Sequence, residues 1–146
     1  MSKPFHFKLE KVLDYRGQLE EQAKSALAAA QAAYNTQLEQ VRTIEANMAA
    51  HMAKQEESQK SPNDMWLWRQ YKEALEIDLS KAQMELNKLE LNLQQKRNEA
   101  VERSKDRKLL EKLKETQAKK HHEEESAREE KENDEMATIR YESQDL

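Results

Sequence analysis

The chain has 146 residues, of which 37% are charged, 36% are hydrophobic and 5% are aromatic, and its mean hydropathy is -1.18. One glycine and two prolines are too few turn-formers for a sheet protein, and so few aromatic residues cannot fill a thick globular core. The composition is typical of long helices that are stabilised by a seam of contacts along their length. We therefore expect one elongated all-α domain over residues 1–146.

Hydropathy, cysteine content and the distribution of charge bear on where the protein is located and on which chemistry it can carry out. No apolar run approaches the ~18 residues needed to span a bilayer, and the first six residues lack the apolar core of a signal peptide, so we expect a cytoplasmic protein. The absence of cysteine excludes disulfides and thiolate chemistry. The net charge of -4 is unevenly spread: residues 96–120 carry ten Lys/Arg against five Asp/Glu, whereas residues 123–146 carry three against ten.

The first helix is expected over about residues 5–57, with Pro4 at its start. Its early face follows the 3-4 spacing through Leu9, Val12, Arg16, Leu19, Ala23, Ala26 and Ala30. A later face has Leu27, Tyr34, Val41 and Met48 seven residues apart, joined by Leu38 and Met52, and is offset by one position. We expect the alanine-rich residues 26–33 to absorb this register shift, because small side chains let a partner helix approach at any position.

A turn is predicted over about residues 58–62. Ser61 is placed to cap a second helix, with Pro62 at its first position and Asp64 three residues after the cap. This second helix is expected over about residues 63–140. Between residues 75 and 93 it carries a narrow apolar stripe with one residue per turn: Leu75, Leu79, Ala82, Leu86, Leu89 and Leu93.

Folding the chain back at the turn places one seam against the other. Val41 then meets Leu79, Leu38 meets Ala82 and Met52 meets Arg69. The prediction is an all-α fold of two long helices in an antiparallel coiled-coil hairpin, the second helix being longer. The alternative, a parallel homodimer of each helix, is less favoured because a cap and a turn separate the helices.

Near the termini, Arg103 and Arg107 fall at seam positions, where we expect them to pair with Asp14, Glu10 or Glu20. The acidic tail, residues 123–146, has no partner in the hairpin and only Met136 and Ile139 as an apolar foothold. Two states of the tail stay open: a projecting charged helix, or a segment that is ordered only by a binding partner.

Enzymatic activity is not expected, because a two-stranded coiled coil has no cleft in which catalytic groups converge. No cofactor or metal site is expected either. His121 and His122 point about 100° apart on a helix and are poorly placed to share a metal ion. Five acidic residues lie among the bases of 96–120, so we expect no nucleic-acid partner.

Two apolar features do not belong to the seam. Ile77, Met84 and Leu91 are seven apart on the outer side of the second helix, and they suggest a docking face, although scattered exposed apolar residues are common. Trp66 and Trp68 lie beside the turn. We expect one of them to close the hairpin end against Met48 and Met52, and the other is a candidate contact point.

Three stretches in order resemble the FliJ family of flagellar export proteins: residues 5–16 (FHFKLEKVLDYR), residues 106–114 (DRKLLEKLK) and residues 132–137 (ENDEMA). The resemblance implies a non-enzymatic stalk of the flagellar type III protein export apparatus, cytoplasmic and peripheral at the inner face of the membrane at the flagellar base. The implied partners are the hexameric export ATPase, the membrane export gate component and substrate-specific export chaperones, with a general chaperone or chaperone-escort role.

The resemblance also assigns candidate sites. The export gate, or another partner, would meet the middle of the hairpin at Val41, Ile44, Met48, Tyr71, Leu75, Ile77, Met84 and Leu91. The ATPase would meet the paired termini at Leu9, Val12, Leu13, Arg16, Arg107, Leu110 and Leu113. The competing hypothesis is a general coiled-coil scaffold or spacer without an ATPase partner.

Overall fold

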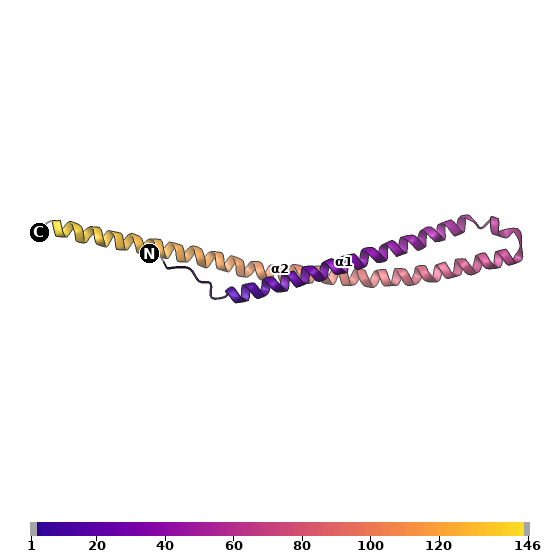
Figure 1. Cartoon of the computed structure of the whole chain (residues 1–146), viewed down its shortest axis with the longest axis horizontal. Helices are drawn as coiled ribbons and strands as arrows, with labels where there is room; N and C mark the ends of the chain where they lie inside the picture. The colour runs from indigo at the N-terminus through magenta and orange to yellow at the C-terminus, as the bar shows by residue number, and fades with distance from the viewer. Residues whose placement is uncertain (1–2, 145–146) are drawn as a thin grey trace. The chain divides into compact units, whose positions relative to one another are not determined.

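The computed structural model describes residues 3–144 and contains two long helices and no strand within that range. Helix α1 spans Glu10–Ala53, a short 3-10 helix η1 spans Glu57–Lys60, and helix α2 spans Pro62–Gln144. The chain reverses direction between α1 and α2, so that the two helices run antiparallel (Figure 1). The expected all-α helical hairpin with a longer second helix is confirmed.

Packing divides the chain into two units. Unit 1 comprises the residues up to Glu20 together with those from Glu102 onward, and unit 2 comprises Glu21–Val101. Each unit contains parts of both helices, and each is described separately below.

The core of unit 2 is a seam between α1 and α2. Buried apolar side chains from both helices contribute to it, and Gln37 Nε2 donates a hydrogen bond to the carbonyl oxygen of Ala82 at 2.9 Å. A second contact of this kind joins His51 and Trp68, in which His51 Nε2 lies 2.8 Å from the carbonyl oxygen of Trp68. Both contacts are one residue away from the pairs expected from the sequence. The buried apolar residues of unit 2 are Ala30, Val41, Trp68, Leu75, Ala82, Leu93 and Ala100.

The predicted register shift in α1 is wrong. A 3-4 pattern of buried and half-buried side chains runs along α1 without an offset, whereas Leu9, Val12 and Met52 are exposed. Leu19, Ala26 and Leu38 are half-buried beside this pattern. The pattern includes polar residues that the expected faces left out, namely Glu20, Gln37 and His51. Its members are Leu13, Arg16, Glu20, Ala23, Leu27, Ala30, Tyr34, Gln37, Val41, Ile44, Met48 and His51.

The hairpin end of unit 2 is organised by a cap and an aromatic stack. The backbone N–H of Asp64 donates to Ser61 Oγ at 3.1 Å and Pro62 is the first residue of α2, so the predicted cap is confirmed. Trp68 is 9% exposed and stacks on His51 with ring centroids 4.7 Å apart, while its Nε1 donates to the carbonyl oxygen of His51 at 3.0 Å. Trp66 is 58% exposed. One tryptophan thus closes the end, and its main partner is His51.

Both ends of α1 differ from the expected helix over about 5–57. Helix α1 stops at Ala53 because the next backbone N–H groups bond three residues back, as Lys54 does to His51 at 3.1 Å. At the start of α1, residues 3–9 are not helical. Phe7 is buried, and Phe5 lies with its ring centroid 5.7 Å from that of His121.

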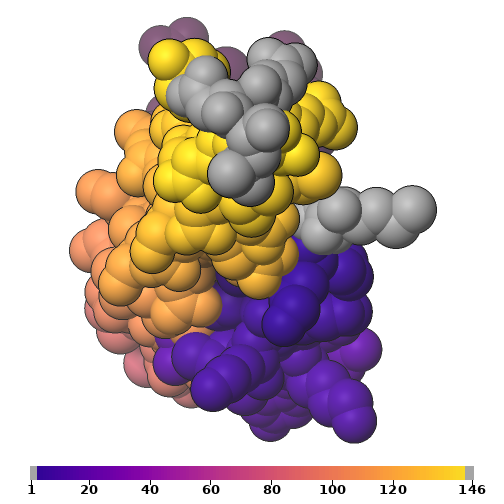
Figure 2. Space-filling view, turned by 90° about the vertical axis from the view of Figure 1, so that its left-hand side faces the viewer, coloured from indigo at the N-terminus to yellow at the C-terminus, as the bar shows by residue number. Residues whose placement is uncertain are grey.

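The N-terminal segment of unit 1 lies on α2. His121 Nε2 is 2.8 Å from the carbonyl oxygen of Lys3, and the Lys3 backbone nitrogen donates to Glu125 Oε2 at 3.4 Å. Figure 2 shows the indigo N-terminal part of the chain next to α2. Beyond this contact α2 continues as a helix to Gln144, and every side chain from Ser126 to Ser143 is exposed.

Candidate partner-binding surfaces

A charged network crosses the seam of unit 1. Glu20 is 3% exposed, and its Oε2 lies 2.6 Å from Arg107 Nε. Arg107 also reaches one turn along α2, where its guanidinium lies 2.6 Å from Glu111 Oε2. A buried carboxylate needs such a partner, because an uncompensated charge in a seam is costly. The expected pairing of Arg107 is confirmed, with Glu20 as the partner, whereas Arg103 is exposed and lies outside the seam.

The network stabilises the charged form of Arg107. Its hydrogen bond to Glu20, and then the one to Glu111, raise the pKa of Arg107 above its usual value, against a smaller opposing effect of desolvation. A guanidinium is charged at any physiological pH, so the raised pKa reports the strength of these two contacts and not a change of charge state.

Two further contacts tie the helices of unit 1 together. The guanidinium of Arg16 donates to the carbonyl oxygen of Asp106 at 3.0 Å, and Lys114 Nζ lies 2.8 Å from Glu10 Oε2. The sequence reasoning missed the pairing of Lys114 with Glu10, because it considered arginine but not lysine as a seam residue. Polar groups thus carry much of the specificity of this part of the hairpin.

The seven residues expected to contact an ATPase separate into two groups. Leu110 is buried, Leu13 is half-buried, and the two arginines are held in the contacts described above. The other three are exposed and available to a partner: Leu9, Val12 and Leu113.

Two of these exposed residues, Val12 and Leu113, share one flank of unit 1. With Glu20 at an a position, Val12 is at a g position, and with Arg107 at an a position, Leu113 is also at a g position. The g positions of two antiparallel helices lie on the same side of their seam. The bond from Arg16 to Asp106 is on this side as well, since Asp106 is at a g position.

This flank is more apolar than the sequence suggested. Tyr15 and Leu109 occupy the c positions next to the g positions, and Leu109 is 66% exposed. The sequence contained a signal for both, since Tyr15 lies three residues after Val12 and Leu109 lies four residues before Leu113. Tyr15, Val12, Leu109 and Leu113 together form what we call the terminal flank.

The residues expected to face an export gate also fall into two groups, one inside the seam and one exposed. Val41 and Leu75 are 4% and 6% exposed and lie inside the seam of unit 2, while Ile44 and Met48 are half-buried. Exposed members remain: Tyr71, Ile77, Met84 and Leu91. Tyr71 packs edge-on against His51 with ring centroids 4.6 Å apart, so its ring is fixed at the hairpin end.

An outer stripe of exposed apolar side chains follows from these positions. At about 100° per residue, Trp66, Ile77, Met84 and Leu91 fall on one face of α2. All four side chains are more than half exposed, and Leu91 reaches 74%. This set is called the outer stripe below.

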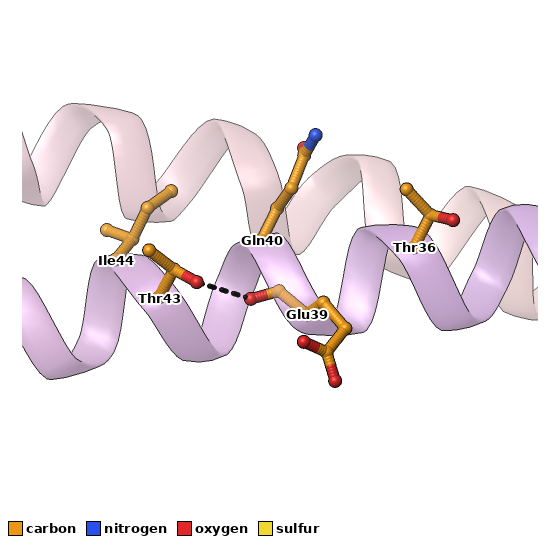
Figure 3. Close-up of a pocket in the computed structure, with 5 residues that line it drawn as sticks. All are labelled: Thr36, Glu39, Gln40, Thr43 and Ile44. Atoms are coloured by element: carbon orange, nitrogen blue, oxygen red, sulfur yellow. Dashed lines mark hydrogen bonds between the residues drawn. The ribbon is translucent and has the colours of Figure 1, made fainter.

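Surface depressions in unit 2 are shallow. The one in Figure 3 is lined by Thr36, Glu39, Gln40, Thr43 and Ile44, all from α1. The Thr43 hydroxyl donates to the carbonyl oxygen of Glu39 at 3.0 Å. Within residues 3–144 no group of three potential metal-ligating side chains is close enough to hold an ion, and no helix is long and apolar enough to cross a bilayer.

Comparison with known proteins agrees with this architecture. The solved structure of a putative YscO homolog, CT670, from Chlamydia trachomatis is similar, with a TM-score of 0.56 and 20% sequence identity over 95% of this chain and 96% of that chain. No curated protein matches the chain. The family model described as "Flagellar FliJ protein" matches residues 5–145. The chain therefore belongs to the FliJ family, the structural stalk proteins of the flagellar type III export apparatus.

Proposed function

We propose that this chain binds and organises the hexameric export ATPase through the terminal flank of unit 1 and engages the membrane export gate through unit 2. Family membership supports a role in the flagellar export apparatus, and the exposed apolar flank supports the proposed place of the ATPase contact. In this role the protein works by binding and does not catalyse a reaction itself.

The terminal flank is the observation that carries the proposal. Four large apolar or aromatic side chains from two helices are exposed together, beside the contact of Arg16 with Asp106. Apolar anchors next to oriented charged groups are typical of interfaces in which a few residues supply most of the binding energy. The buried network of Glu20 and Arg107 holds the two helices in the register that brings the anchors together.

The test uses Leu109→Ala/Leu113→Ala in the full-length protein. Both side chains are exposed, so the variant should keep its helical content while its stimulation of the cognate export ATPase falls by about tenfold or more, as expected for loss of one or two anchors. The matched control is Ile77→Ala/Met84→Ala, which removes the same kind of exposed side chain from unit 2 and should stimulate the ATPase normally.

The outcomes separate this proposal from a general coiled-coil scaffold. A scaffold without an ATPase partner predicts that the wild-type protein changes neither hexamer assembly nor ATP turnover. Equal stimulation by the wild type and by the Leu109/Leu113 variant would locate the ATPase contact elsewhere and refute the assignment to the terminal flank.

The outer stripe is the proposed face for the gate component or for export chaperones. Exposed Met84 adapts to partners of different shape, and Ile77 and Leu91 flank it one heptad away on each side. A pull-down with the purified cytoplasmic region of the gate component should lose the Ile77→Ala/Met84→Ala variant and keep the Leu109→Ala/Leu113→Ala variant. Binding to the gate would also bring the chain to the inner face of the membrane as a peripheral protein. The reverse pattern of binding would exclude this division of roles.

A further inference from the structure

The charged part of α2 in unit 1 has an internal symmetry that the proposed function does not use. Three lysines in the basic segment and three acidic residues in the tail follow one another at spacings of four, seven, four, seven and four residues. All six side chains are exposed: Lys108, Lys112, Lys119, Glu123, Glu130 and Asp134.

These six residues share one face of the helix. At 100° per residue they fall within an arc of about 80°, centred opposite His121. His121 itself faces the N-terminal segment, since its ring bonds to the carbonyl oxygen of Lys3. The stripe therefore points away from the residues that unit 1 already covers.

The six charges have no partner within the described part of the chain. Ion pairs along this stretch of α2 use other side chains, as Arg107 does with Glu111 and Arg128 does with Glu125 and Glu132. No ion pair among residues 3–143 includes a member of the stripe.

The order of the charges is complementary to its own reverse. If a second copy of α2 runs antiparallel with its residue 121 opposite the same residue of the first copy, Lys119 meets Glu123, Lys112 meets Glu130, and Lys108 meets Asp134. A two-fold axis generates each pair twice, because an isologous interface uses the same patch on both copies. A parallel copy would instead place each charge opposite its like.

We infer that the protein self-associates through this stripe, forming an antiparallel two-fold contact between the α2 helices of two copies. Exposed ion pairs are individually weak and are screened by salt, so the contact is reversible and depends on ionic strength. This inference is independent of the ATPase and gate assignments.

Sedimentation of the full-length protein tests the contact. Self-association is expected at about 10 mM salt, where charges interact over roughly 30 Å, and the dissociation constant should rise by at least about tenfold at 1 M salt, where the range is about 3 Å. A protein that stays monomeric at low salt and millimolar concentration would overturn the inference.

Charge reversal provides the specific test. The basic-reversed variant, Lys108→Glu/Lys112→Glu/Lys119→Glu, and the acidic-reversed variant, Glu123→Lys/Glu130→Lys/Asp134→Lys, should each be monomeric, yet a mixture of the two should form a heterodimer. The control, Lys54→Glu/Lys81→Glu/Lys88→Glu, makes the same change in net charge as the basic-reversed variant, at exposed positions of unit 2, and should associate like the wild type. Circular dichroism confirms helical content in each case. A mixture that fails to associate would refute the pairing.

Orientation is tested by single labelled cysteines, since the chain has no native cysteine. In the antiparallel dimer, labels on His122→Cys should lie within about 20 Å of each other, and labels on Ala137→Cys should be about 50 Å apart, from 1.5 Å per residue along each helix. Short distances at both positions would mean a parallel contact and would contradict the inferred symmetry.

Discussion

Glu20 and Arg107 form an ion pair that helps to fix the register of unit 1. Glu20 is buried in a seam that apolar residues usually fill, and Arg107 is its ionic partner at 2.6 Å. The replacement Arg107→Met leaves Glu20 without this partner, so we expect a clear fall in melting temperature. The double replacement Glu20→Leu/Arg107→Met should melt well above Arg107→Met, because a buried pair is often replaced by apolar residues at little cost. Thermal unfolding followed by circular dichroism measures both, and equal melting temperatures for the single and double variants would contradict this account.

The two tryptophans beside the turn should differ sharply in their contribution to stability. Trp68 is buried, stacked on His51 and hydrogen-bonded through Nε1, so we expect Trp68→Ala to lower the free energy of unfolding by about 3 kcal/mol. Trp66 is exposed, and Trp66→Ala should change the free energy of unfolding by less than about 0.5 kcal/mol. Chemical denaturation of the two variants provides the comparison, and similar losses would mean that Trp66 also packs.

At the scale of single elements, the start of α2 depends on the side chain of Ser61. Its Oγ accepts the backbone N–H of Asp64, which has no partner within the helix. Ser61→Ala should destabilise unit 2 by about 1 kcal/mol, whereas Ser61→Asp should retain most of the stability because aspartate also caps. Urea denaturation of the three proteins checks the order, and no loss in the alanine variant would show that the cap is not needed.

Helix α1 contains one intrinsic weak point at Gly17. A Cβ added there would meet no atom within 4 Å, and the glycine has no positive φ that would strain another residue. Gly17→Ala should therefore stabilise the helix by up to about 1 kcal/mol. A higher urea midpoint is the expected measurement. A lower midpoint would contradict this account, because it would mean that the added Cβ destabilises the folded hairpin.

Across the whole molecule, protection of the backbone should follow the distribution of buried side chains. Residues 126–143 are helical but have every side chain exposed, whereas the α2 residues of unit 2 include several buried ones. An isolated charged helix has no tertiary packing to stabilise it, so its amides should exchange with solvent much faster than those of residues 75–93. Hydrogen exchange with mass spectrometry measures both segments. Strong protection of 126–143 that disappears on dilution or at high salt would instead report self-association.

Local sequence signals determined the fold class, the position of the turn and the pairing of α1 with α2 to within a residue: a narrow apolar stripe indicated the helices, and a Ser-Pro cap indicated the turn. The exposed positions of Ile77, Met84 and Leu91 followed from the same spacing. The sequence already placed Arg107 in the seam with three candidate acidic partners; the tertiary structure decided that Glu20 is the partner and that Gln37 and His51 also enter the seam. Arg16, Glu20, Gln37 and His51 are compatible with solvent in an isolated sequence, and a partner helix has to supply an ion pair, a carbonyl group or an aromatic ring before they can be buried.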